Sequence, residues 1–190
     1  MKATLLFFAF FQLFIAFGME DEKSGPRYVI QVRQEQTLLG DIVIELFPGK
    51  APLHCKNFDS LVAMNFFNGT AFHRIDPDFM IQGGDPNSKD PSKAPETWGF
   101  GDPSQKKVPA EFNDYSHVRG TVSAARGEDK NSADSQFFIC VKDSDFLDGE
   151  YSAFGKVISG MDIVDAIATS PRDSKTERPL QKITMTISKQ

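Results

Sequence analysis

The sequence has few of the residues on which most enzyme chemistry depends. Its only cysteines are Cys55 and Cys140, and they form no Cys-x-x-Cys pair. The three histidines, His54, His73 and His117, do not stand at metal-ligand spacing. The sequence contains no Gly-x-Ser-x-Gly turn and no phosphate-binding glycine loop. We therefore expect no metal and no cofactor, and we disfavour hydrolase, redox, kinase and metalloenzyme functions.

Positive charge is also scarce. Lys and Arg number 21 against 26 Asp and Glu, which gives a net charge of −5 and a pI near 5.2. Nucleic-acid binding depends on a basic surface, so we expect no nucleic-acid partner. A chain of 190 residues with 40% hydrophobic content suits one soluble domain with a real core.

Long hydrophobic runs are missing except at the N-terminus. Residues 1–18, "MKATLLFFAFFQLFIAFG", place Lys2 before an almost purely apolar stretch, and a charged segment follows. This layout predicts a secretory signal peptide, followed by a flexible lead-in over 19–27. The run is shorter than the roughly 20 residues of a membrane-spanning helix, and a short uncleaved anchor is the alternative. We expect an exported protein, periplasmic or secreted, with no membrane association after cleavage.

Export would permit a disulfide between Cys55 and Cys140. A chain of this length does not need one, however, and sequence alone cannot place the two residues within bonding distance. We therefore favour two buried free thiols, with the disulfide as the alternative.

The segment 28–188 has the pattern of a mainly β domain. Helical spacing is confined to a segment that starts at Ala51 and to 160–168, and residues 85–109 form a long loop rich in proline and glycine. The remaining apolar segments are short and read as strands, with no β-α-β rhythm; they lie at 28–32, 40–47, 70–75, 78–84, 120–125, 135–141, after the turn at 148–149, and at 179–187. An antiparallel barrel whose ends are covered by two helices accounts best for this pattern.

Three of the expected strands carry a polar side chain among apolar ones. These are Arg74 in "AFHRI", Gln82 in "FMIQGG" and Gln136 in "SQFFIC". Each could simply satisfy buried backbone groups. An arginine beside two glutamines, with no matched acid, favours a binding site instead.

The alternation of side chains along a strand assigns the neighbours of these polar groups. Phe72 would share a face with Arg74, and His73 would point the other way. Met80 would likewise accompany Gln82, and Phe138 would accompany Gln136. If the strands are neighbours, one face gathers the arginine, both glutamines and apolar side chains.

Four blocks of the sequence resemble the cyclophilin family of peptidyl-prolyl isomerases. They are "FHRIDPDFMIQGGD", "GTVSAAR", "SADSQFFI" and "FLDGEYSAFGKVISGMDIVDAI", and the similarity runs from about Tyr28 to Ser188. The resemblance implies a closed eight-stranded antiparallel barrel capped by two α-helices. Closure of the barrel is implied by the family, since periodicity does not supply it.

The resemblance also implies roles for single residues. Arg74 matches the family's catalytic arginine, and Gln82 matches the glutamine that holds the substrate backbone and steadies that arginine. His73 is expected to be structural. The remaining substrate-binding positions are the walls of the proline pocket, Phe79, Met80, Phe138 and Leu147, the neighbouring groove, Ala125, Arg126 and Gln136, and the variant positions Phe146 and Tyr151.

Three of these positions depart from the common eukaryotic pattern. Phe146 replaces a tryptophan, which removes an indole N–H and predicts weak binding of cyclosporin. Tyr151 replaces a histidine and Arg126 an asparagine, changes that would alter substrate preference. The Phe146 and "SADSQFF" variants, with "VPAEFN" at 108–113, are more similar to bacterial members.

The sequence therefore predicts a monomeric prolyl isomerase that accelerates Xaa-Pro rotation in the folding of exported proteins. Its partners would be proline-containing segments, and its mechanism would stabilise a twisted amide without covalent chemistry. The alternatives are a module that binds proline peptides or acts as a chaperone without catalysis, and an unrelated barrel enzyme.

Overall fold

The computed structural model describes residues 24–190. The predicted signal peptide, 1–18, and the lead-in up to residue 23 lie outside the described residues. The strands are β1 (Arg27–Gln34), β2 (Thr37–Leu46), β3 (Phe72–Ile75), β4 (Met80–Gly83), β5 (Thr121–Ala124), β6 (Phe137–Cys140), β7 (Ala153–Ser159) and β8 (Ile183–Lys189). The helices are α1 (Pro52–Ala63), α2 (Met161–Ala168) and the 3-10 turns η1 (Pro86–Lys89), η2 (Pro95–Thr97) and η3 (Asp145–Leu147).

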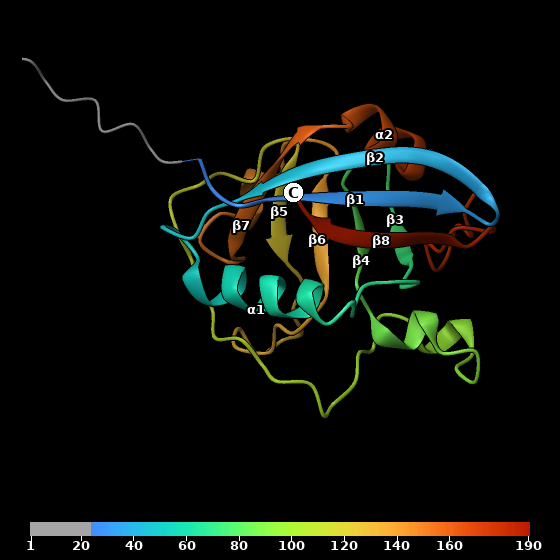
Figure 1. The fold of residues 1–190 in the computed structure, drawn as a ribbon, viewed down its shortest axis with the longest axis horizontal. Helices are drawn as coiled ribbons and strands as arrows, with labels where there is room; N and C mark the ends of the chain where they lie inside the picture. The colour runs from blue at the N-terminus through green and yellow to red at the C-terminus, as the bar shows by residue number, and fades with distance from the viewer. Residues whose placement is uncertain (1–23) are drawn as a thin grey trace, which may run out of the picture.

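The strands form one antiparallel sheet in the order β3-β4-β6-β5-β7-β2-β1-β8. The two ends of this order meet through the residues just before β3. Ala71 bridges to Thr184, and the Met185 N–H donates to the Thr70 carbonyl at 2.9 Å. The result is a nearly closed barrel with α1 below the strands and α2 above them in Figure 1. The predicted eight-stranded antiparallel barrel with two helices is confirmed.

Helix α1 is held at its start by a distant acid. Pro52 occupies the first turn, where its missing N–H costs nothing. The Glu111 carboxylate accepts hydrogen bonds from the Leu53 and His54 N–H groups, both at 2.9 Å, and from His54 Nδ1 at 2.7 Å. The buried face of α1, which includes Phe58, then packs into the barrel core.

Gly160 alone joins the end of β7 to the start of helix α2 and is the N-cap residue of that helix. This residue has φ +89°, and a Cβ there would lie 2.3 Å from the Asp41 carbonyl oxygen, so only glycine fits. Val164 and Ile167, fully buried, face the core. Among residues 24–190 no helix has the length and hydrophobicity that crossing a bilayer requires.

Neighbouring residues of β6 face opposite sides of the sheet. Phe137 and Ile139 belong to the barrel core, whereas Phe138 and Cys140 belong to a second buried cluster outside it. We call this second set the pocket cluster: Met80, Phe138, Cys140 and Leu147, with Phe79, Ala125 and Tyr151 packed against it. The two-residue period of the strands thus separates a closed core from a site.

The expectation that Phe72 and Arg74 share a face is wrong. The pairing of β3 with β4 slips between them, because Phe72 stands opposite Gly83 and Arg74 opposite Gln82. Three residues of β3 therefore oppose two of β4, the geometry of a β-bulge. Phe72 packs into the barrel core, 6.5 Å from the Phe137 ring, while Arg74 lies on the outside.

Two further expectations can be compared with the structure. Strand β1 starts at Arg27, and the Pro26 carbonyl accepts from the Leu46 N–H at 3.0 Å, so the sheet includes the end of the predicted lead-in. Cys55 and Cys140 are buried free thiols, as predicted. Burial raises the pKa of each thiol to about 12.

Candidate functional site

A cavity of about 120 Å³ opens beside the pocket cluster. All of the site residues expected from the sequence line it except Gln136 and Phe146. They come from β3, the turn before β4, β4 and β6, the segment after β5, and the turn η3 with its following loop; they are Arg74, Phe79, Met80, Gln82, Ala125, Arg126, Phe138, Leu147 and Tyr151.

The floor of the cavity is apolar and rigidly supported. Met80 is 1% exposed, Phe138 5% and Leu147 6%. The Phe138 ring stacks on the imidazole of His117 at 6.1 Å and meets the Tyr151 ring edge-on at 5.7 Å. His117 is itself fixed, because its two ring nitrogens lie 2.8 Å from Asp148 Oδ1 and 2.9 Å from Ser123 Oγ. The supporting role of His117 was not predicted from the sequence.

Arg74 stands at the edge of the cavity. Its side chain is 42% exposed, and its Cζ lies 5.9 Å from the centroid of the Phe79 ring. Its Nε donates to Glu177 Oε2 at 2.6 Å. The expectation that this arginine has no matched acid is therefore wrong. Sequence reasoning missed Glu177 because it lies 103 positions away, in the loop between α2 and β8.

The two glutamines of the site bond to each other. Gln82 Nε2 donates to Gln136 Oε1 at 3.1 Å, and Gln136 Nε2 donates to the Gly99 carbonyl at 3.1 Å. Gln82 stands opposite Arg74 in the sheet, but the hydrogen bond that holds the guanidinium comes from Glu177. The glutamine pair instead ties β4 to the segment before β6 and to the long loop.

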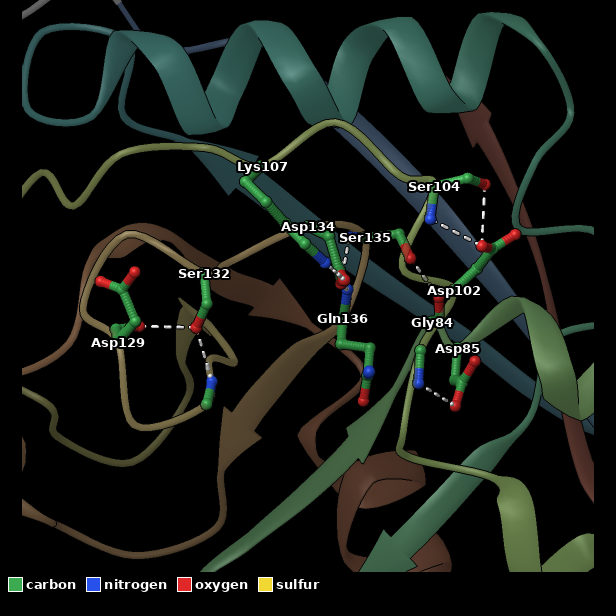
Figure 2. A network of polar contacts seen from close by, with 12 residues as sticks. Gly84, Asp85, Asp102, Ser104, Lys107, Asp129, Ser132, Asp134, Ser135 and Gln136 are labelled. Atoms are coloured by element: carbon green, nitrogen blue, oxygen red, sulfur yellow. Dashed lines mark hydrogen bonds and ion pairs between the residues drawn. The ribbon is translucent and has the colours of Figure 1, made fainter.

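Gln136 lines a second hollow of about 320 Å³, which shares Gln82, Ala125 and Arg126 with the first. Figure 2 shows polar contacts made by residues that line it and by their neighbours. Lys107 pairs with Asp134 at 2.8 Å, and Ser135 Oγ donates to the Gly84 carbonyl at 2.8 Å. Because they share Gln82, Ala125 and Arg126, the two hollows together form one groove.

Arg126 is a wall of this groove. Its guanidinium lies 4.5 Å from the centroid of the Tyr151 ring and donates to the carbonyls of Glu150 and Gly127. Its side chain is only 13% exposed. Two of the three residues that depart from the common family pattern, Arg126 and Tyr151, are therefore in contact with each other.

Phe146 does not line the cavity. It is 69% exposed, and its ring lies 5.6 Å from that of Phe79 at the rim. His73 is buried at the bulge and is not a lining residue. Burial lowers the pKa of His73 to about 4, so the ring is neutral near pH 7.

The lining offers binding and electrostatics more than covalent chemistry. It presents an apolar floor, the guanidinium groups of Arg74 and Arg126, and the side-chain amide of Gln82. The nearest thiol, Cys140, is fully buried, and its raised pKa keeps it protonated and therefore weakly nucleophilic. The arrangement suits a reaction in which a bound group changes shape or charge distribution without forming a bond to the protein.

Comparison with known proteins identifies the family. Residues 29–189 match the sequence model described as cyclophilin type peptidyl-prolyl cis-trans isomerase/CLD. A peptidyl-prolyl cis-trans isomerase of Acinetobacter baylyi is 46% identical over 143 residues, 72% of this chain and 71% of the relative. The human peptidyl-prolyl cis-trans isomerase-like 3 is 40% identical over 149 residues, 77% of this chain and 88% of the relative.

Solved structures show the same fold. A cyclophilin type peptidyl-prolyl cis-trans isomerase of Cryptosporidium parvum has a TM-score of 0.74 at 29% identity, over 87% of this chain and 97% of that chain. A second structure of that protein, determined in the presence of the dipeptide Ala-Pro, has a TM-score of 0.73 at 30% identity, over 86% and 98% of the two chains.

Proposed function

The chain belongs to the family of cyclophilin-type peptidyl-prolyl cis-trans isomerases, and from that premise we propose that Arg74 catalyses the rotation of an Xaa-Pro bond held in the 120 Å³ cavity. The observation that carries this proposal is the position of a partly exposed guanidinium beside an apolar floor. The related Cryptosporidium protein, studied with Ala-Pro, supports proline-containing segments as the substrate class.

The reaction requires no bond to be made or broken. Amide resonance sets a barrier of about 18–20 kcal/mol to rotation, so uncatalysed exchange at an Xaa-Pro bond takes tens to hundreds of seconds. A catalyst must bind the twisted amide more tightly than either planar form. No general base or nucleophile is needed, which agrees with the residues that line the cavity.

We assign the pocket cluster the role of holding the proline ring. Met80, Phe138 and Leu147 give a nearly dry apolar surface, and the stacking of Phe138 on His117 keeps that surface in place. Burial of the ring fixes one side of the rotating bond. The rest of the peptide would lie along the second hollow, where the Gln82–Gln136 pair and Gly99 present amide groups.

Arg74 supplies the differential interaction. As the amide twists, resonance is lost and a lone pair develops on the proline nitrogen, whereas in the planar forms this electron density is delocalised. A fixed cation in a partly dry site interacts more strongly with the twisted form. The apolar floor lowers the local screening and so strengthens this interaction.

The direct test is exchange spectroscopy on a short Ala-Pro peptide with the wild-type protein and with Arg74→Ala. We expect acceleration by the wild type and a loss of about 100-fold or more in the variant, the scale of one well-placed donor. Peptide titration should show that Arg74→Ala still binds, because the floor is intact. Wild-type rates in Arg74→Ala would refute the mechanism, and binding without acceleration by the wild type would indicate a non-catalytic proline-peptide module.

The place of action is a second proposal. The apolar run of residues 1–18 supports export of the chain, to the periplasm or the outside of a bacterial cell, where the client proteins would be exported proteins that fold slowly at proline. We expect the mature protein to start near Met19 and to be a monomer. N-terminal sequencing of the protein recovered from cell fractions tests this, and an intact Met1 in the cytoplasmic fraction would refute it.

A further inference from the structure

Among residues 24–190, the side chain of the catalytic candidate Arg74 makes a single hydrogen bond. Its Nε donates to Glu177 Oε2 at 2.6 Å, and the side chains of the two residues are 42% and 29% exposed. The terminal nitrogens of the guanidinium make no hydrogen bond within residues 24–190. The acid therefore binds the inner edge of the guanidinium and leaves its outer edge available to a peptide.

The loop that carries Glu177 is built to hold this carboxylate in place. Glu177 has φ +56°, a left-handed conformation that non-glycine residues rarely adopt. Its N–H donates to the Asp173 carbonyl at 2.9 Å, and its own carbonyl accepts from the Ile75 N–H at 2.8 Å. The Asp173 carboxylate accepts from the N–H groups of Lys175 and Thr176, at 3.0 and 2.8 Å.

The same loop is attached to the chain directly after Arg74, at Ile75 and Asp76. Arg172 Nη1 donates to the Ile75 carbonyl at 3.0 Å and lies 3.7 Å from Asp76 Oδ1. The Ile75 backbone is thus bonded to the loop through both its N–H and its carbonyl. Because Ile75 directly follows Arg74, the positions of the guanidinium and of the acid are set by one connected piece of structure.

We propose that Glu177 is a positioning residue that fixes the orientation of the Arg74 guanidinium toward the proline pocket, an inference that rests on the proposed function of Arg74. A charge-assisted hydrogen bond is short and directional, and it restricts the rotamers of a long side chain. Glu177 does not line the cavity. Its loss should therefore reduce the rate of rotation and leave peptide binding nearly unchanged.

The experiment compares Glu177→Ala and Glu177→Gln with the wild type by exchange spectroscopy on an Ala-Pro peptide over a range of peptide concentrations. We expect Glu177→Ala to lower the saturating rate about 10-fold while KM stays within about twofold. Glu177→Gln should lose about threefold, because a neutral acceptor still bonds the Nε–H but at roughly half the strength.

A matched control lies next in the sequence. Arg178 pairs with Glu96 at 3.5 Å and does not line the cavity. Arg178→Ala therefore perturbs the same loop without removing the Arg74 partner, and it should keep both kinetic constants within about twofold of wild type. Thermal unfolding of all three variants checks that they are folded at the assay temperature.

A second readout is specific to the guanidinium. In the wild type the Arg74 Nε–Hε signal should exchange slowly with water, and Glu177→Ala should make this exchange fast while backbone signals of β4 and β6 stay in place. A merely structural role of the loop would not move this signal alone.

The failures of the two proposals are distinguishable. Wild-type rates in Glu177→Ala, alongside an inactive Arg74→Ala, would overturn the role of Glu177 and leave that of Arg74 intact. Equal losses in Glu177→Ala and Arg178→Ala would also overturn it, since they would indicate a general effect of the loop. Full activity in Arg74→Ala would overturn the proposed function and this inference together.

Discussion

The barrel core and the pocket cluster are built from alternate residues of the same strands. On β6, Phe137 and Ile139 point inward and Phe138 and Cys140 point outward. On β4, Ile81 belongs to the core and Met80 to the pocket cluster. Both regions are apolar and both are buried. They differ in their boundaries, because the core is enclosed by the barrel and its two helices, whereas the pocket cluster borders an open cavity.

Alternate residues of one strand can therefore serve different purposes: one set stabilises the fold and the other set forms the site. A side chain in the closed core is surrounded by partners, and its removal leaves a cavity inside the protein. A side chain that faces the open cavity has fewer protein contacts to lose, and its surface serves the ligand. A substitution on the core face should therefore mainly lower the free energy of unfolding, whereas a substitution at the neighbouring position on the cavity face should mainly weaken peptide binding.

The largest expected effect separates Phe137 from Phe138. The Phe137 ring is 1% exposed and packs against the rings of Phe58, Phe67 and Phe72, so Phe137→Ala should lower the free energy of unfolding by about 3–5 kcal/mol. Phe138→Ala should cost clearly less stability but should raise KM for an Ala-Pro peptide about 10-fold or more, because the pocket loses its wall.

Urea unfolding and exchange spectroscopy of both variants measure the two effects. The comparison fails if Phe138→Ala is the less stable variant, or if folded Phe137→Ala shows the larger rise in KM. Either result would mean that the two faces of β6 are not functionally separate.

The next effect concerns His73, the residue at the bulge between the two regions. Burial lowers its pKa from 6.5 to about 4, although the nearby Asp85 carboxylate acts in the opposite direction and Arg74 adds to the lowering. The unfolded chain therefore binds a proton at His73 more readily than the folded protein does. The contribution of His73 to stability should be constant above about pH 7, and stability should fall as the pH drops from 6.5 to 4. The loss is on the order of 3 kcal/mol.

The variant His73→Gln isolates this contribution, because it removes the titrating group at a similar size. Unfolding free energies measured from pH 7 to pH 4 should show a shallower decline in the variant than in the wild type. Parallel curves would show that His73 is not buried in its neutral form. The other acid-sensitive groups, including His54, whose pKa is also lowered by burial, contribute equally to both proteins.

Much of the fold could be predicted from local patterns. The alternation in "SQFFIC" separated Phe138 from its core neighbours Phe137 and Ile139, and the spacing around Met161, Val164 and Ile167 correctly gave α2. Local patterns did not predict closure of the barrel, since closure depends on a bridge between Ala71 and Thr184, which are 113 positions apart (184 − 71) and adjoin the two ends of the strand order. It came from the resemblance to the family.

The sequence predicted most of the residues that line the cavity, but it did not predict the hydrogen bonds and ring contacts that hold them in place. The bulge that separates Phe72 from Arg74 interrupts the alternation of side chains between the two faces of the sheet. The segment "AFHRI" contains no glycine or turn sequence that would predict this bulge. The contacts of Arg74 with Glu177 and of Phe138 with His117 join segments far apart in the chain. Such contacts are set by tertiary packing, which a single sequence does not show.

The most direct test of the central claim, that a fixed guanidinium lowers the barrier to rotation, is the saturating exchange rate of Arg74→Lys on an Ala-Pro peptide. Lysine keeps the charge but lacks the planar fork, and it has no Nε–H to bond with Glu177. We predict a rate at least about 10-fold below wild type with KM within about twofold. A wild-type rate in Arg74→Lys would contradict the claim, because it would show that the held orientation of this group is irrelevant to catalysis.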